Sequence, residues 1–277
     1  MRRRESQDEN IRTLTNHDYI QLSDFHQEPI RSFYEIQRSI PFHTVISNNS
    51  SKYGDYFSVN FEDITVYTSS NDLTNLYIGM IDKNQGVIIS LNIDVHRKLF
   101  EDINWGFGAK KMSMLPNAGG QSELSEILSC EIVERILGVE LDKTEMEIDY
   151  FFMNQPMTDY LVSNRNLSQF ALGVSVTRAF SYRRRYTKHD AYRLLSKKLS
   201  GINSSTRNIL NVRIWKQILH IWCPSGRVAN IVRKVYSKLP KEFTSNTIVM
   251  LTVVNCKWYF EPGIKSCGES ERPILGG

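Results

Sequence analysis

The chain has 277 residues, of which 41% are hydrophobic and 23% are charged, and its formal net charge is +4. This composition is ordinary for a globular protein, and the length allows one large domain or two modest ones. No apolar run approaches the roughly 18 residues that a membrane span needs, and no apolar segment follows Arg2-Arg3-Arg4. We therefore expect an intracellular protein, in the cytoplasm or nucleus, that is neither secreted nor membrane-bound.

The positive charge is concentrated in one segment. Residues 178–240 contain 15 Lys or Arg and a single acid, Asp190, whereas residues 1–177 are net acidic. A long basic segment of this kind is typical of a surface that binds nucleic acid or another polyanion. Two alternatives remain open: a solvated face without a partner, and a face that pairs with the acidic part of the same chain.

The four cysteines are widely spaced and form no CxxC pair, so neither a zinc site nor a disulfide framework is expected.

The N-terminal part divides where its composition changes. Residues 1–30 are rich in Asn, Gln, Asp and Glu and predict a polar tail. Residues 31–110 predict a β-rich region, with strands between about 44 and 93 and a turn at Asn71-Asp72, arranged as a small sheet laid against the main domain. Glycines and prolines between residues 105 and 120 predict a boundary loop, and residues 111–277 are expected to form the main domain.

The main domain is predicted from hydrophobic periodicity and from capping and turn residues. The order α-β-β-β-α-β-α-β indicates an α/β fold. In chain order the predicted elements are a helix over 122–137, strands over 144–153, 157–163 and 170–180, a helix over 189–199, a strand ending at 222, a helix over 226–239 and a strand over 247–254.

Acidic side chains on the first helix are the first candidates for a site. Glu126 shares a helical face with Cys130, Val133 and Leu137, and a carboxylate on an apolar face is costly unless something binds it. Glu123 lies one turn earlier, where favourable interaction with the helix dipole is the alternative explanation.

Further acids follow on the first two predicted strands. Glu145, Glu147 and Asp149 alternate with other residues and would share one strand face, which for Glu145 and Glu147 we interpret as solvent-facing. If the intervening turn is centred on Gln155, Asp159 lies on the same sheet face as Asp149. An acid inside a strand is depleted by propensity and needs a reason.

The third strand leads into the basic segment. Ser175 and Thr177 would point one way and Arg178 the other, so the two hydroxyls either line a metal or phosphate site or are tolerated polar groups of the core. Arginines interleaved with tyrosines suit phosphates and unstacked bases. The candidate nucleic-acid-binding residues are Arg178, Arg183, Arg184, Arg185 and Lys188, and the next helix adds Lys197 and Lys198.

The residues Gly119–Glu126, Met157–Tyr160 and Gly173–Ala179 together resemble the core of the PD-(D/E)xK, or restriction-endonuclease-like, nuclease superfamily over about residues 118–223. The resemblance implies an α-β-β-β-α-β nuclease core within 111–277. It implies Mg²⁺ or Mn²⁺ bound by Glu126 or Glu123 and by Asp159, and metal-assisted hydrolysis of phosphodiester bonds in DNA or RNA.

The chain departs from the family pattern in two places. Thr158 replaces the proline before Asp159, and Ser175-Val176-Thr177 replaces the (D/E)xK motif, so the strand acid and the lysine are both absent. Lys197 or Lys198 would supply the positive charge and Asp149 the missing carboxylate. A nuclease fold that binds nucleic acid without cleaving it, and a protein–protein interaction domain, are the alternatives.

Overall fold

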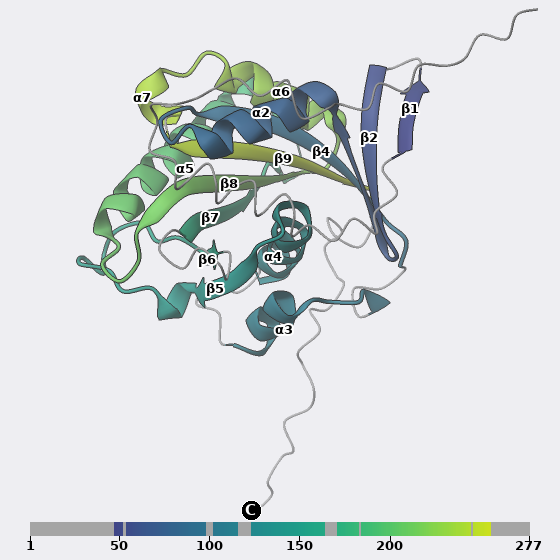
Figure 1. Cartoon of the computed structure of the whole chain (residues 1–277). Coiled ribbons are helices and arrows are strands. Elements are labelled where there is room, and N and C mark those ends of the chain that lie inside the picture. The colour runs from purple at the N-terminus through teal and green to yellow at the C-terminus, as the bar shows by residue number, and fades with distance from the viewer. Residues whose placement is uncertain are drawn as a thin grey trace, which may run out of the picture.

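The computed structural model describes residues 47–51, 54–97, 102–115, 123–163, 171–182, 184–244 and 246–255 (Figure 1). In these residues the strands form one sheet in the order β1-β2-β3-β4-β9-β8-β7-β6-β5. The strands are β1 (Ser47–Ser51), β2 (Gly54–Phe61), β3 (Ile64–Ser69), β4 (Val87–Val95), β5 (Glu140–Thr144), β6 (Tyr160–Ser163), β7 (Ala171–Arg178), β8 (Ile214–Cys223) and β9 (Thr247–Asn255). The helices are α2 (Ser70–Ile81), α3 (Phe107–Met114), α4 (Glu123–Leu137), α5 (Lys188–Asn208), α6 (Gly226–Tyr236) and α7 (Lys241–Thr244).

The centre of the sheet is parallel and its two flanks are antiparallel. β4, β9, β8 and β7 run in the same direction. The residues of β7, β8 and β9 are almost continuously buried, as expected for strands covered on both faces, whereas buried residues alternate with more accessible ones along β4. On one side β3 pairs antiparallel with β4, β2 with β3 and β1 with β2, and on the other side β6 pairs antiparallel with β7 and β5 with β6. The α/β class expected from the sequence is confirmed.

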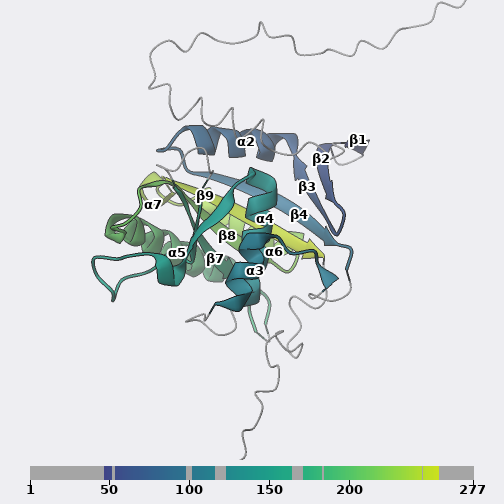
Figure 2. The same ribbon diagram turned by 60° about the horizontal axis from the view of Figure 1, so that its bottom comes forward.

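Helices cover both faces of the sheet (Figures 1 and 2). Apolar side chains of α2, α3 and α4 belong to one core cluster, and those of α5 and α6 belong to a second cluster on the opposite face. Within the described ranges, no helix is long and apolar enough to cross a membrane.

The N-terminal strands differ from the arrangement that was expected. β4 pairs along its length with β9, from Val87 opposite Ile248 to Asp94 opposite Asn255, so β1–β4 continue the main sheet and do not form a separate sheet laid against it. The predicted turn at Asn71-Asp72 was wrong: Ser69 caps α2 by accepting a hydrogen bond from the Asp72 backbone N–H. The predicted boundary loop contains α3, and residues 1–46 lie outside the described part.

In the main domain the elements occur in the predicted order, but one strand is misplaced. The expected strand over 144–153 is instead β5, which ends at Thr144, followed by a 3₁₀ turn over Glu145–Glu147. The β5–β6 pair joins Thr144 to Tyr160, so the expected hairpin centred on Gln155 does not form. Helix α5 is about twice as long as predicted and continues to Asn208.

Two buried polar residues of β8 hold neighbouring elements in place. Lys216 is fully buried, and its ammonium donates to the backbone carbonyls of Asp82, Lys83 and Gln85 at 2.6–3.0 Å, which anchors the turn between α2 and β4. Burial lowers the pKa of Lys216 to about 8. His220 is fully buried between Ser129 of α4 and Thr252 of β9, and burial lowers its pKa to about 3, so it is a neutral hydrogen-bonding link of the core.

Candidate active site

Asp159 lies where strands β6 and β7 begin to separate. Its backbone N–H donates to the Val174 carbonyl at 3.0 Å, and β6 begins at the next residue, Tyr160. The Asp159 carboxylate accepts a hydrogen bond from the backbone N–H of Val176. The side chain therefore takes the place of the β6 backbone as a partner of β7, which fixes the direction of the carboxylate.

Lys198 reaches the same point of β7 from helix α5. Its ammonium donates to the Val176 carbonyl at 3.0 Å, so Val176 binds Asp159 through its N–H and Lys198 through its C=O. Lys198 is half-buried, and its positive charge favours the ionised form of Asp159. Lys197, the other lysine considered from the sequence, is exposed on the same helix.

Two further carboxylates approach Asp159 from α4 and from the 3₁₀ turn. Glu126 and Glu145 line a hollow with Asp159, and we call this the acidic hollow; its lining residues are Met112, Leu115, Glu126, Thr144, Glu145, Met146 and Asp159. Its volume is about 30 Å³, which is room for about one water molecule or ion. The predicted apolar face of α4 is confirmed, since Glu126 and Cys130, Val133 and Leu137 are all buried.

The charges around the acidic hollow repel one another. Burial raises the pKa of Asp159 to about 7; Lys198 opposes this rise, whereas Glu126 and Glu145 add to it. Burial and the charge of Glu126 also raise the pKa of Glu145, again opposed by Lys198. Burial raises the pKa of Glu123, and the neighbouring Glu126 raises it further. Asp159 and Glu145, two acids with raised pKa values in one hollow, make the hollow a candidate functional site.

The arrangement can hold a divalent cation only through a small number of protein ligands. Among the described residues, no three His, Cys, Asp or Glu side chains are grouped so that they could hold a metal ion. Mg²⁺ is commonly bound through one or two carboxylates and keeps several waters. Carboxylate oxygen is the donor type that Mg²⁺ and Mn²⁺ prefer, so Asp159 with Glu126 or Glu145 fits such an ion with water completing its shell.

Glu145 is the residue that the sequence analysis assigned to solvent. The assignment assumed that the strand continued through 145–149, whereas the chain turns at Thr144 and places Glu145, half-buried, in the acidic hollow. The signal was present in the sequence: Thr144 and Glu147 form a capping box, the S/T-x-x-E pattern that starts a helical turn. Glu147 itself is bound to Lys111 at 2.9 Å and is exposed.

Asp149, Ser175 and Thr177, the other ligand and lining residues proposed from the sequence, do not line the acidic hollow. Asp149 is exposed, and its backbone N–H donates to Asn211. Ser175 is buried and Thr177 half-buried, both on the face of β7 opposite Val174 and Val176, which pack into the α4 core.

The basic residues collect around the end of β7 and the start of α5. Arg178 is half-buried and donates to the Ser125 hydroxyl of α4 at 2.6 Å. Arg184 is exposed and pairs with Asp190 through two hydrogen bonds of 2.6 Å. Arg185 and Lys188 are exposed, and Arg183 lies outside the described residues.

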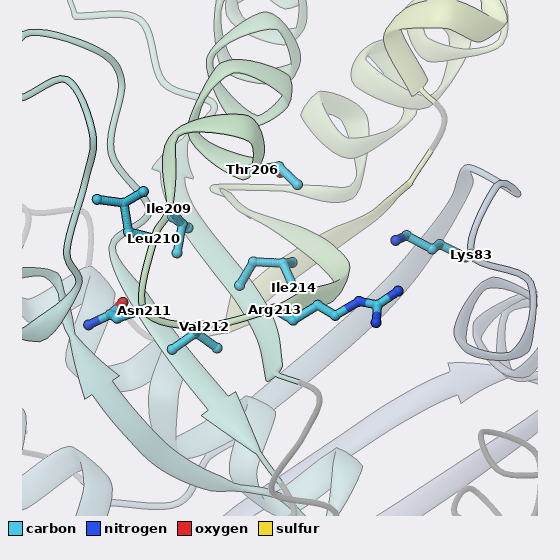
Figure 3. Close-up of a pocket in the computed structure, with 8 residues that line it drawn as sticks. All are labelled: Lys83, Thr206, Ile209, Leu210, Asn211, Val212, Arg213 and Ile214. Atoms are coloured by element: carbon cyan, nitrogen blue, oxygen red, sulfur yellow. The ribbon is translucent and has the colours of Figure 1, made fainter.

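Figure 3 shows a second hollow, of about 460 Å³, where α5 leads into β8. Lys83 and Arg213 bring two cations to it, and the ammonium of Lys83 lies 6.0 Å from the ring centroid of Trp215. The lining residues are Lys83, Thr206, Ile209, Leu210, Asn211, Val212, Arg213 and Ile214, so the two hollows share none.

Comparisons with known proteins give no functional assignment. No family model and no solved structure matches the chain. The AAC-rich mRNA clone AAC4 protein of Dictyostelium discoideum is 34% identical over 193 residues, which cover 66% of this chain. The match covers 28% of that relative, so the chain spans less than a third of its length.

Proposed function

We propose that the protein is a divergent metal-dependent nuclease that hydrolyses phosphodiester bonds of DNA or RNA. The observation that carries this proposal is the acidic hollow, where Asp159, Glu126 and Glu145 interact electrostatically with one another and with Lys198. A divalent cation would relieve the repulsion among these carboxylates, because it favours their ionised forms.

The order of elements supports the resemblance to the PD-(D/E)xK superfamily. Helix α4 is followed by β5, β6 and β7, then by α5 and β8, and these strands are neighbours in the sheet in the order β5-β6-β7-β8. Glu126 comes from the helix and Asp159 from the start of the second strand. A fold alone does not specify an activity, so the argument depends on the side chains in the hollow.

Neighbouring elements offer replacements for the two missing motif residues. The third strand has Ser175 and Thr177 where the family has an acid and a lysine. Lys198 of α5 reaches the backbone of Val176, between those two positions, and Glu145 of the 3₁₀ turn adds a carboxylate. In this proposal α5 supplies the ammonium and the 3₁₀ turn after β5 supplies the third acid.

The residues would have distinct roles in such a reaction. Mg²⁺ or Mn²⁺, bound by Asp159 with Glu126 or Glu145, would supply an activated water and charge neutralisation at the phosphate. The Val176 N–H holds the Asp159 carboxylate in position, and the half-buried Lys198 would stabilise the negative charge that develops on the phosphate. Arg178, Arg185 and Lys188 would bind the backbone phosphates of the substrate.

The test is cleavage of labelled single- and double-stranded DNA and RNA with Mg²⁺, with Mn²⁺ and with a chelator. We expect metal-dependent cleavage that falls at least about a hundredfold in Asp159→Asn, because the substitution removes a metal ligand. Asp142→Asn is the matched control, since Asp142 is exposed on β5 and should leave cleavage unchanged. Cleavage that persists in chelator, or in Asp159→Asn, would refute the proposal.

A second function is favoured by the metal-site geometry. Because no three described metal-ligating side chains form a group able to hold an ion, a nuclease fold that binds nucleic acid without cleaving it is the alternative. Salt-sensitive binding of nucleic acid with no cleavage under any metal condition would favour this alternative.

A further inference from the structure

Three large apolar side chains are exposed in the segment between the 3₁₀ turn and β6. Phe151, Phe152 and Met153 are 67%, 60% and 74% exposed. Clustered exposed apolar side chains usually mark a binding surface. The rings of Phe151 and Phe152 pack edge to face with centroids 4.6 Å apart, so the pair presents a defined aromatic surface.

The backbone beneath these rings is held by Asn208, the last residue of α5. The Phe151 N–H donates to the Asn208 carbonyl at 2.9 Å. The Asn208 side-chain amide accepts from the Phe152 N–H at 2.8 Å and donates to the Phe152 carbonyl at 2.7 Å. The aromatic pair is therefore preorganised, which lowers the entropy that binding would cost.

The segment then follows α5 toward the acidic hollow. The Thr158 hydroxyl hydrogen-bonds that of Ser205 at 3.0 Å, and Pro156 lies 3.2 Å from the position a Cβ of Gly201 would occupy. Asp159, which follows Thr158 in the chain, lies beside Lys198. The aromatic pair and the acidic hollow are thus connected along one side of α5.

Exposed basic residues continue this line toward the start of α5. Arg193 and Lys197 are exposed and precede Gly201 by eight and four residues, so each lies about one helical turn from the next along the same side of α5. From Lys197 to Asn208 the helix rises by about 16 Å at 1.5 Å per residue. Along α5, the exposed cations Arg193 and Lys197, then Lys198 at the acidic hollow, and then Asn208 at the aromatic pair therefore follow one another in this order.

We propose that Phe151 and Phe152 form a stacking platform for unpaired bases, and that the substrate is a single-stranded nucleic acid whose backbone follows the basic face of α5. This inference rests on the proposed function and specifies its substrate. Rings that stack on bases need base faces that a duplex hides, and sequence-tolerant single-strand binding combines such rings with a basic groove. Arg193 and Lys197, which are exposed further along α5, favour a polyanion over an apolar protein segment as the partner.

The test measures binding by the full chain of a labelled single strand of about 20 nucleotides and of the matching duplex, in chelator, by fluorescence anisotropy. The double variant Phe151→Ala, Phe152→Ala should bind the single strand at least about tenfold more weakly, with unchanged salt dependence and unchanged duplex binding. Phe107→Ala is the control, because Phe107 is 80% exposed on α3 and should leave both affinities unchanged.

Charge variants test the path of the backbone. Arg193→Ala and Lys197→Ala should each reduce the slope of log affinity against log salt for single strands by about 0.7, whereas Lys238→Ala, at an exposed position after α6, should not. Unchanged single-strand affinity in the double variant would overturn the inference. If the double variant changed the oligomeric state of the protein and not its single-strand affinity, the aromatic pair would be a protein contact.

The binding assay and the cleavage assay separate the two proposals. Metal-dependent cleavage that is lost in Asp159→Asn but unaffected by the double variant would uphold the nuclease and reject the platform. Single-strand binding that depends on Phe151 and Phe152, with no cleavage by the wild type, would reject the nuclease and uphold the platform as a binding surface.

Discussion

Two acids of helix α4, Glu131 in its C-terminal half and Glu126 in its first turn, have different partners. Glu131 accepts hydrogen bonds from the Gly106 N–H at 2.7 Å and from Arg135 at 2.6 Å, and Arg135 also binds Asp63 at 2.6 Å. At the N-terminal end, Glu126 faces Asp159 and Glu145, and Lys198 is the cation that favours their ionised forms.

The pKa values follow from these partners. Burial raises the pKa of Asp63, but the hydrogen bond and charge of Arg135 outweigh it, so the pKa is lowered overall. The pKa of Asp159 is raised to about 7, because burial and two other carboxylates outweigh Lys198. The pKa values of these two acids therefore differ in direction because of the charges around them, although burial raises both.

The largest expected effect is on stability, at the ion pairs that Arg135 forms with Asp63 and Glu131. Arg135→Met would leave Asp63 and Glu131 buried without their cation, and we expect the free energy of unfolding to fall by about 3–4 kcal/mol. Urea unfolding measures the change. Arg97→Met is the control: Arg97 meets Glu62 at 3.7 Å on the surface, and its loss should cost less than about 0.5 kcal/mol. Equal effects of the two substitutions would contradict a structural role for the ion pairs of Arg135.

At the acidic hollow the expected change has the opposite sign. Asp159→Asn removes a carboxylate that ionises against burial and against Glu126 and Glu145, while the amide oxygen can still accept the Val176 N–H. We expect the free energy of unfolding at pH 8 and without metal to rise by about 1–2 kcal/mol. Asp63→Asn, in contrast, should lower it. If both substitutions destabilise the chain alike, Asp159 is an ordinary structural acid.

The pH dependence of stability sharpens the same point. The pKa of Asp159 rises from 3.8 to about 7 on folding, so between these values the folded state binds more protons than the unfolded state. The contribution of Asp159 to stability therefore falls as pH rises from about 4 to about 7. Asp63, with a lowered pKa, contributes stability that is lost only as pH falls below about 4.

A divalent cation should counter the loss at Asp159, because it binds the ionised form. We expect the free energy of unfolding, measured in chelator, to fall between pH 5 and pH 7.5 because of Asp159. With Mn²⁺ in place of chelator, this fall should be about 1 kcal/mol smaller. Asp159→Asn should abolish this response to metal. A response that is identical in the variant would place the cation elsewhere.

Local signals account for what the sequence predicted at the site. The apolar face of α4 singled out Glu126, and the strand acid Asp159 was conspicuous by propensity. Glu145 was misassigned because strand alternation was extended past Thr144, although the capping box of Thr144 and Glu147 marks a helical turn there. Lys198 was distinguished from Lys197 only by the packing of α5 against β7.

Long-range pairing accounts for the errors in the fold. Whether β4 joins the main sheet depends on β9, about 160 residues further along the chain, and no local periodicity encodes that pairing. Helix α2 was missed for a different reason: Asn71-Asp72 has turn composition, yet Ser69 and Asp72 hydrogen-bond as a helix start.

The smallest expected effect concerns whether Glu123 belongs to the acidic hollow. Glu123 is half-buried in the first turn of α4, where its charge suits the helix dipole, but burial and Glu126 raise its pKa. Because it does not line the hollow, Glu123→Gln should change the free energy of unfolding by less than about 0.5 kcal/mol. It should weaken Mn²⁺ binding less than about twofold, whereas Glu126→Gln, which removes a lining carboxylate, should weaken it about tenfold or more. Calorimetric titration with Mn²⁺ measures both, and a loss for Glu123→Gln as large as for Glu126→Gln would extend the metal site to the first residue of α4.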